Sequence, residues 1–244
     1  MRYGILGDIH ANLSALSVAL GVLDSAGVDQ IVSVGDVVGY GAAPAECIAL
    51  LRERRVQVVQ GNHDAACAGR LDDEYFNRYA REAVRWTQGQ LSQDDLAWLG
   101  QLPLSLELEH CHVAHGTLAG PEHFDYLLGV ENARPSIQAM RKPVCFVGHS
   151  HLPITVIEPR EAVGRLGYSP DSEVDLSETR RAIVNVGSVG QPRDEDPRLA
   201  VALYDTEEAF VRIERHPYDI ATEAERIVSA GLPKILGDRL WLGI

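Results

Sequence analysis

Three adjacent polar residues, Asn62, His63 and Asp64, follow a glycine and an apolar, β-branched run at 56–60. The run predicts a short buried strand. An amide, an imidazole and a carboxylate side by side would each need a polar partner if buried, so they suit a hydrophobic core poorly. They suit a site well, because strand ends in open α/β sheets deliver side chains to the crevice where ligands bind.

Other polar motifs occupy similar places, each directly after an apolar run that reads as a strand. They are Asp8 with His10, then Asp36, then His115, and finally the pair His149 and His151. Each motif alone is weak, since an Asp-x-His or a Gly-His-x-His sequence also occurs by accident or in a turn. Five polar motifs at five predicted strand ends indicate one shared site that binds metal.

The candidate ligands supply carboxylate, imidazole and amide groups and no thiolate. They are Asp8, His10, Asp36, Asn62, His115, His149 and His151. Mixed nitrogen and oxygen ligands suit Mn, Fe, Zn or Co and exclude a structural zinc site of the cysteine type. The set is too large for one ion and sufficient for two, provided that one carboxylate bridges ions about 3.5–4 Å apart.

Such a pair of ions has a specific use. Both ions lower the pKa of a bridging water, and both stabilise oxygens during an in-line displacement at phosphorus. His63 lies beside the candidate ligand Asn62 and is placed to protonate the leaving oxygen, with Asp64 fixing its orientation. The remaining histidines are predicted to be surface or packing residues. They are His110, His112, His123 and His216.

Composition limits the class of protein. The chain has 244 residues, 45% of them hydrophobic, which suits a single domain over 1–244 with a small lid. A net charge of -13 argues against bulk nucleic-acid binding and means that an anionic substrate would need bound cations. A charged residue follows too soon for a signal peptide, no apolar run reaches about 18 residues, and no cysteines form a C-x-x-C pair. We therefore expect a cytoplasmic protein with free, buried thiols and no membrane contact; its oligomeric state is open.

The first part of the chain alternates between strands and helices. Helical spacing of leucines predicts a helix over 12–26, and a second helix is predicted over 44–54. Strands alternating with helices predict parallel pairing with right-handed crossovers. A helical insertion is predicted over about 72–100, with helices at 73–90 and from 92 onward, and its aromatic residues are expected to pack rather than to stack on a substrate.

The second part of the chain is richer in strands. A strand with one solvated face is predicted over 104–113, a polar loop over 158–181, and a helical stretch broken near 231–233 over 220–240. Further elements are a helix at 131–140 and strands at 144–147, 154–157, 182–186, 199–204 and 209–215. This order predicts two packed sheets, with the first half of the chain mixed and rich in parallel strands and the second half more antiparallel.

The order of motifs, Asp-x-His, Gly-Asp, Gly-Asn-His-Asp, His and Gly-His-x-His, resembles the calcineurin-like metallophosphoesterase family. Within the family, the chain is more similar to small bacterial and archaeal phosphoesterases of poorly defined substrate than to the protein serine/threonine phosphatases. The resemblance implies an α/β fold: a four-layer α/β/β/α sandwich of two mixed sheets, with the helical insertion after the third strand and a dinuclear centre between the sheets. It implies His63 as general acid and Asp36 as the bridging ligand. One metal would take Asp8, His10, Asp36 and His151, and the other Asp36, Asn62, His115 and His149.

The sequence departs from the protein serine/threonine phosphatases, whose second motif continues to an Asp-Arg pair that holds phosphate; here the motif continues to Tyr40. Arg193, after a stretch of small residues, is a candidate phosphate clamp, because its planar fork matches phosphate oxygens. The alternative is a surface arginine paired with Asp194 or Glu195. Tyr40 is placed either to reach the substrate or to pack in its loop.

We therefore expect a metal-dependent phosphoesterase. It would hydrolyse a small phosphodiester or phosphomonoester by means of a hydroxide that bridges two divalent ions. The alternatives are a phosphoprotein phosphatase and a metal-binding scaffold without catalysis. A metal-dependent amide hydrolase is disfavoured, since no His-Glu-x-x-His motif is present.

Overall fold

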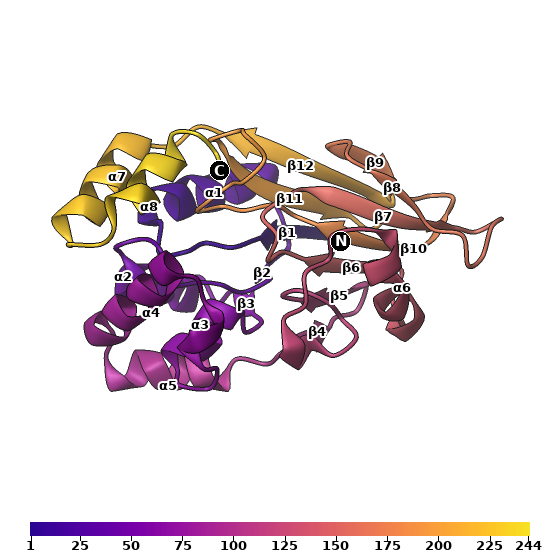
Figure 1. Ribbon diagram of the computed structural model, residues 1–244. Helices are drawn as coiled ribbons and strands as arrows, with labels where there is room; N and C mark the ends of the chain where they lie inside the picture. Colours follow the sequence, from indigo (N-terminus) through magenta and orange to yellow (C-terminus); the bar gives the residue numbers. More distant parts are fainter.

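Figure 1 shows the computed structural model, which describes the backbone of residues 1–244 and every side chain except that of Tyr75. The strands are β1 (Arg2–Leu6), β2 (Gln30–Ser33), β3 (Gln57–Val58), β4 (Ser105–Glu107), β5 (Cys111–Ala114), β6 (Val144–Val147), β7 (Ile154–Pro159), β8 (Gly167–Ser169), β9 (Glu173–Asp175), β10 (Thr179–Asn185), β11 (Leu199–Asp205) and β12 (Phe210–His216). The α-helices are α1 (Leu13–Ala26), α2 (Pro44–Glu53), α3 (Asn62–Cys67), α4 (Arg78–Gln90), α5 (Gln93–Gln101), α6 (Val130–Ala139), α7 (Ile220–Ser229) and α8 (Lys234–Leu240). Short 3₁₀ turns lie at η1 (Asp73–Tyr75) and η2 (Pro121–His123).

The strands form two six-stranded sheets. The first has the order β3-β2-β1-β11-β12-β9 and the second the order β4-β5-β6-β10-β7-β8. The parallel pairs β1–β2 and β2–β3 lie in the first sheet, and β5–β6 and β6–β10 lie in the second. The expectation of two mixed sheets is confirmed, since each sheet contains both parallel and antiparallel pairs. In the first sheet the parallel strands come early in the chain and the antiparallel ones late, whereas the second sheet also contains the early antiparallel pair β4–β5.

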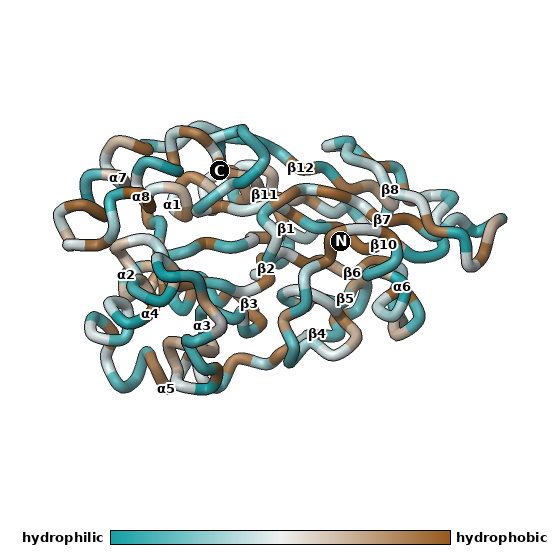
Figure 2. The backbone as a smooth tube through the Cα atoms, viewed as in Figure 1, coloured by the Kyte–Doolittle hydropathy of each residue, from teal (hydrophilic) through white to brown (hydrophobic). Residues whose placement is uncertain are grey.

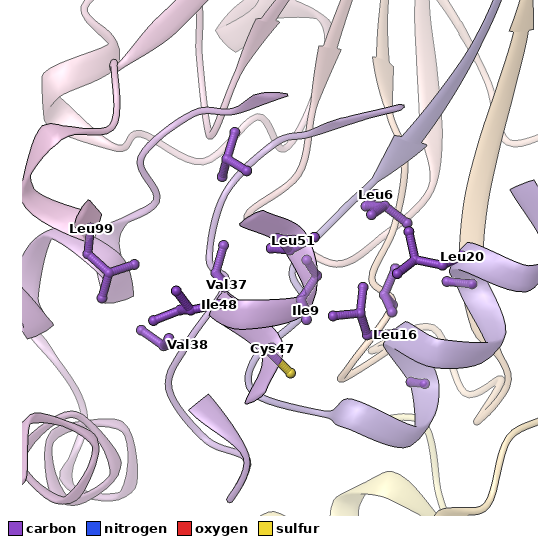
Figure 3. Close-up of a cluster of buried hydrophobic side chains, with 14 of the residues drawn as sticks. Leu6, Ile9, Leu16, Leu20, Val37, Val38, Cys47, Ile48, Leu51 and Leu99 are labelled. Atoms are coloured by element: carbon purple, nitrogen blue, oxygen red, sulfur yellow. The ribbon is translucent and has the colours of Figure 1, made fainter. Parts of the chain in front are cut away.

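Three buried apolar clusters show why the sheets are stacked. One cluster lies between the sheets and includes Ile5 of β1 and Phe146 of β6. A second joins the first sheet to α1 and α2, and Figure 3 shows Leu16 and Leu20 of α1 beside Leu6 of β1. A third joins Ile137 of α6 to the second sheet. The result is the expected α/β/β/α order of layers. In Figure 2, brown stretches of the tube mark hydrophobic residues along β7 and β10 of the second sheet.

Strand alternation explains how one strand serves two layers. In β1, Tyr3 and Ile5 belong to the cluster between the sheets, whereas Leu6 belongs to the cluster under α1. A Cβ on Gly4 would lie 2.7 Å from Leu23 of α1, so the helix packs closely on this face. The helix α1 itself ends as predicted, with Asn12 capping its first turn and Gly27 in the left-handed conformation after its last.

Removing the ring of Phe146 should destabilise the protein without touching the polar centre. The side chain is fully buried between the sheets, and its ring lies 5.5 Å from that of Tyr204. We expect Phe146→Ala to lower the free energy of unfolding by about 3–5 kcal/mol, because the removed atoms leave a cavity. Urea denaturation measures the change. The matched control is Tyr168→Ala on β8, whose side chain is exposed and whose loss should cost little; equal losses would contradict this account of the core.

Two predicted elements differ in the structure. The single strand expected over 104–113 is wrong, because β4 and β5 form an antiparallel hairpin. The Leu108 amide donates to the Cys111 carbonyl and closes the turn. The loop expected over 158–181 contains β8 and β9, which pair with β7 and β12 and so lie in different sheets.

The predicted insertion contains η1, α4 and α5, and Asn77 caps the start of α4 where one continuous helix was expected. The first half of α4 packs against the C-terminal helices: Ala80 and Ala83 share a buried cluster with Ile227 of α7 and Leu240 of α8. Figure 1 shows α7 and α8 (yellow) at the same end of the molecule as α2 and α4. Within the described part of the chain, no helix is long and apolar enough to cross a membrane. All four cysteines are buried and free, as expected.

Candidate metal centre

The structure brings the seven candidate ligands together at the ends of five strands. Asp8, Asp36 and Asn62 follow β1, β2 and β3 of one sheet, while His115 and His149 follow β5 and β6 of the other. His10 and His151 lie two residues further along their loops. All are buried except Asn62, which is half-buried. The side chains predicted from strand ends therefore lie close together in the structure.

Most of these side chains are carried on strained backbone. Positive φ angles of 45° to 68° occur at Asp8, His10, Asp36, His149 and His151. Residues other than glycine rarely adopt positive φ angles, and when they do the surrounding structure must hold them there. Backbone bonds provide this support: the amide of His10 donates to the carbonyl of Asp36 over 2.9 Å. Strain of this kind is typical of functional sites.

Two glycines make room for the carboxylates. A Cβ on Gly61 would lie 2.1 Å from Oδ1 of Asp36, and a Cβ on Gly148 would lie 2.3 Å from Oδ2 of Asp8. The glycines of the Gly-Asn-His-Asp and Gly-His-x-His motifs are therefore needed because a carboxylate occupies the space of the missing side chain.

The first group of ligand atoms comprises Asp8, His10 and His151, which lie within 4.8 Å of one another. The His10 and His151 Nε2 atoms are 3.1 Å apart, and His151 Nε2 is 3.5 Å from Asp8 Oδ1. On the other side of each ring, His10 Nδ1 donates to the Val38 carbonyl and His151 Nδ1 donates to the Gln191 carbonyl. The backbone therefore fixes which nitrogen of each ring faces the centre.

The second group comprises Asp36, His115 and His149. His115 Nε2 is 3.0 Å from both His149 Nδ1 and Asn62 Oδ1, and 3.4 Å from Asp36 Oδ2. His115 Nδ1 donates to the Val34 carbonyl over 2.8 Å, which orients this ring as well. Asp36 Oδ2 also lies 3.7 Å from His10 Nε2 of the first group. Asp36 is therefore the carboxylate between the two groups.

The protonation of these rings tests whether cations fit. Burial lowers the pKa of His10 and of His151 well below the usual value, so both rings are neutral at pH 7. Since their Nδ1 atoms carry the hydrogens, two Nε2 lone pairs face each other across 3.1 Å. Such an arrangement is unfavourable by itself and is satisfied by a cation that both lone pairs bind. The donor set therefore fits a metal ion here.

Charge in the second group supports the same conclusion. Burial acts to lower the pKa of His115, but the Asp36 carboxylate outweighs it and raises the pKa to about 9. Burial acts to raise the pKa of Asp36, yet the charge of His115 holds it well below the usual range. A positive charge beside Asp36 is thus favoured even when a proton has to supply it. A divalent cation would supply the same charge.

His63 lies at the edge of this centre. Its ring is buried, 4.9 Å from the ring of His10, 4.5 Å from that of Tyr40 and 4.8 Å from that of Phe76. Among the described residues, its Nδ1 has no hydrogen-bond partner. One of its ring nitrogens also lies within 4.8 Å of ligand atoms of His10 and Asp36. Burial lowers the pKa of His63 to about 4.

Asp64 does not orient His63 as predicted. Its Oδ1 accepts from the amides of Val37 and Val38, and its Oδ2 accepts from the amide of Gly61 over 3.0 Å. The reason is the helix α3, which begins at Asn62: neighbouring residues on a helix point about 100° apart. Asp64 instead joins the loop that carries Asp36 to the start of α3 and so holds the second and third motifs together.

The structure places Arg193 and Tyr40 next to each other at the centre. The Tyr40 ring packs edge-on against His10 with 4.7 Å between centroids, and the Arg193 guanidinium lies 5.7 Å from the Tyr40 ring centroid. Arg193 donates to Gln191 over 3.0 Å, and within the described structure its buried Nε has no partner. Asp194 pairs with Arg215, not with Arg193. The alternative of a surface pair between Arg193 and Asp194 is therefore wrong.

An open cleft of about 650 Å³ lies over the second group, with Asn62, His63 and His149 at its base. Its walls contain aromatic residues that the reading of the sequence did not single out for a site, including Phe124 and Tyr126 from the loop after β5. Neither residue belongs to a motif. The sequence indicated their role only by placing two aromatic residues shortly after the candidate ligand His115. His123 also lines this cleft, where a surface or packing role had been expected.

Comparison with known proteins agrees with the architecture and the donor set. The family model of the calcineurin-like phosphoesterase superfamily domain matches residues 1–209. An uncharacterized protein from Methanocaldococcus jannaschii is 35% identical over 248 residues, covering 98% of this chain and 97% of the relative.

Solved structures show the same similarity. The crystal structure of a metallophosphoesterase from Sphaerobacter thermophilus has a TM-score of 0.87 and 38% identity, covering 100% of this chain and 99% of that chain. A hypothetical protein from Pyrococcus horikoshii shares the fold at 19% identity with a TM-score of 0.78, covering 100% and 98% of the two chains. With the His and Asp clusters already placed, these matches show that the chain belongs to the calcineurin-like phosphoesterase superfamily, whose members are generally hydrolases that use divalent metals.

Proposed function

We propose that the protein hydrolyses a small phosphoester, a phosphodiester or a phosphomonoester, at a centre that holds two divalent cations. The observation that carries this proposal is the position of Asp36, whose Oδ2 lies 3.7 Å from His10 of one ligand group and 3.4 Å from His115 of the other. A carboxylate between two sets of ligands is how a protein holds paired cations. When bound, such a pair lowers the pKa of water between the ions and stabilises charge on phosphoryl oxygens.

The residues of the chain have separate tasks in this proposal. Asp8, His10 and His151 would hold one cation, while Asn62, His115 and His149 would hold the other, with Asp36 shared. Mn, Fe, Zn and Co all suit this donor set.

His63 donates a proton to the leaving oxygen. Burial keeps its ring neutral when no substrate is present, and an anionic phosphoryl group brought beside it favours the protonated form. His63 lies both at the centre and in the cleft, the position from which a leaving group could be reached.

In this proposal Arg193, which lies against the Tyr40 ring, binds the phosphoryl group. We expect Arg193→Ala to reduce kcat/KM about ten- to hundredfold, mainly by raising KM, because a charge-assisted hydrogen bond is worth about 1.5–3 kcal/mol. Initial rates over a range of substrate concentrations measure this change, and the metal content should stay constant. Arg198→Ala is the control, since Arg198 is an exposed arginine that pairs with Asp196. Unchanged kinetics in the Arg193 variant would exclude the clamp.

Paired initial rates on p-nitrophenyl phosphate and bis-p-nitrophenyl phosphate test the proposed function. The protein is stripped of metal and reloaded with Mn²⁺, and metal content is measured alongside. Hydrolysis of either compound supports a phosphoesterase, and the preferred compound assigns the diester or the monoester class. No hydrolysis of either compound with two metals bound per chain would contradict the proposal and favour a metal-binding scaffold.

A further inference from the structure

The cleft above the metal centre has two aromatic walls. Phe76, between η1 and α4, lies edge-on to His63 with 4.8 Å between ring centroids. Tyr126 also lines the cleft, and its ring stacks on the His149 ring at 3.8 Å and 17°. Tyr126 is nevertheless 47% exposed.

The large rings in these walls do not serve the hydrophobic core alone. Phe124 approaches His115 edge-on at 6.0 Å on a left-handed backbone, with φ of 51°. Tyr40 completes the lining beside His63, at 4.5 Å. Aromatic rings held by the catalytic and metal-binding histidines define a space for a flat apolar group next to the phosphorus position.

The charges of the cleft limit what this group can be. Among the described residues that line it there is no Lys or Arg, and Glu122 is the one carboxylate. A second phosphate or another anionic group on the Glu122 side of the cleft would therefore meet a negative charge. Arg193 lies just outside this lining, against the Tyr40 ring and beside Tyr126, so the positive charge of the site is concentrated at that end.

The polar groups at the rim suit the edge of a nucleobase. The Asn77 side-chain oxygen is already used to cap α4, accepting from Tyr79 and Ala80, which leaves its NH₂ group to offer as a donor. Glu122 offers an acceptor. The edge of a nucleobase presents donors and acceptors together, whereas the side of a phenol or an alkyl chain does not. A cleft of about 650 Å³ is also within the range of sites that enclose ligands of this size.

From this geometry we propose that the cleft binds the uncharged nucleoside part of a nucleoside phosphoester, with Phe76 and Tyr126 as the residues that select for the base. This inference rests on the proposed phosphoesterase function and names the class of its substrate. The phosphoryl group lies at Asp36 and Arg193, and the base lies between the aromatic walls. The ligand proposed here carries no further charged group on its nucleoside part.

Ligand-observed NMR titrations with adenosine and with ribose test the proposal. The protein is loaded with Zn²⁺ for this experiment, because Zn²⁺ is diamagnetic and Mn²⁺ is not. Neither compound contains a phosphoester, so binding is measured independently of turnover. We expect adenosine to bind at least about fivefold more tightly than ribose, because stacking one base on an aromatic ring is worth about 1–3 kcal/mol. Saturation transfer should be strongest at the adenine protons.

Three variants separate stacking from general damage. Tyr126→Ala removes one aromatic ring from the lining of the cleft, and Phe76→Ala removes another. Each should weaken adenosine binding about fivefold or more and leave ribose binding unchanged. Tyr79→Ala is the matched control, because Tyr79 is an exposed aromatic on α4 that does not line the cleft. If Phe76→Ala fails to fold, Tyr126→Ala decides the question, since its ring contributes little to the core.

The outcomes distinguish this inference from the function on which it rests. Equal affinity for adenosine and ribose, or full adenosine affinity in Tyr126→Ala, would overturn the nucleoside assignment, even if bis-p-nitrophenyl phosphate is hydrolysed. Tighter binding of N-acetyltyrosinamide than of adenosine would also overturn it, in favour of phosphotyrosine. Adenosine binding without hydrolysis of any phosphoester would overturn the phosphoesterase function, and with it the placing of the nucleoside in a substrate.

Discussion

Replacing Asp36 with Asn should cause a large loss of both bound metal and activity. Asp36 Oδ2 lies between His10 and His115, so the change weakens both ligand groups at once. Its Oδ1 also accepts from the amide of His63 over 2.9 Å and so anchors the start of α3. We expect a loss of bound metal and a fall in kcat of at least about a hundred- to a thousandfold, the loss typical when transition-state charge loses its support.

Metal analysis by mass spectrometry and initial rates measure these two effects. The matched control is Asp219→Asn, at the exposed N-cap of α7, where Asn caps as well as Asp does. That variant should keep its metal and its kcat. Thermal unfolding followed by circular dichroism checks that both variants are folded. An Asp36→Asn protein with its full metal content and a kcat within about tenfold of the parent would mean that Asp36 is not the shared ligand.

The ligands could be predicted from sequence because two simple patterns coincide. Apolar runs mark strands, and polar residues that are costly to bury follow those runs at Asp8, Asp36 and His115. The backbone supports of the rings could not be predicted. His151 is oriented by the carbonyl of Gln191, and every residue carries a carbonyl, so no residue type reveals that contact.

Pairings between short strands were equally hidden. The strand β9 has three residues, too few for a pattern of alternation to stand out from a polar loop, and its partner β12 begins 35 residues further along the chain. The hairpin of β4 and β5 was missed because apolar residues continue on both sides of the turn at 109–110. Its tight closure became visible only in the structure.

Sequence neighbours were also misleading where a helix begins. Asp64 was expected to fix the orientation of its neighbour His63, but α3 turns the two side chains apart. The aromatic wall from Phe124 and Tyr126 depends on a loop conformation that no motif encodes. The chemistry of the site residues was therefore easier to predict from the sequence than the contacts between them.

His63→Ala should separate proton donation from metal binding. The ring contacts Tyr40 and Phe76, and among the described residues its Nδ1 has no partner that would give it a structural task. We expect metal content to stay unchanged and kcat to fall by about 10²–10⁴, as is typical when a general acid is removed. The loss should be smaller for p-nitrophenyl esters than for phenyl esters, because p-nitrophenolate leaves with little need of a proton.

The dependence on the leaving group distinguishes the two possible tasks of His63. Its ring lies within 4.8 Å of ligand atoms of His10 and Asp36, a distance that also suits a metal ligand. A ligand's removal would lower metal content and would slow phenyl and p-nitrophenyl esters by the same factor. A general acid's removal would spare the metal and penalise the poorer leaving group more. Metal analysis together with rates on both esters therefore assigns His63 to one task, and equal slowing with metal loss would overturn its role as the acid.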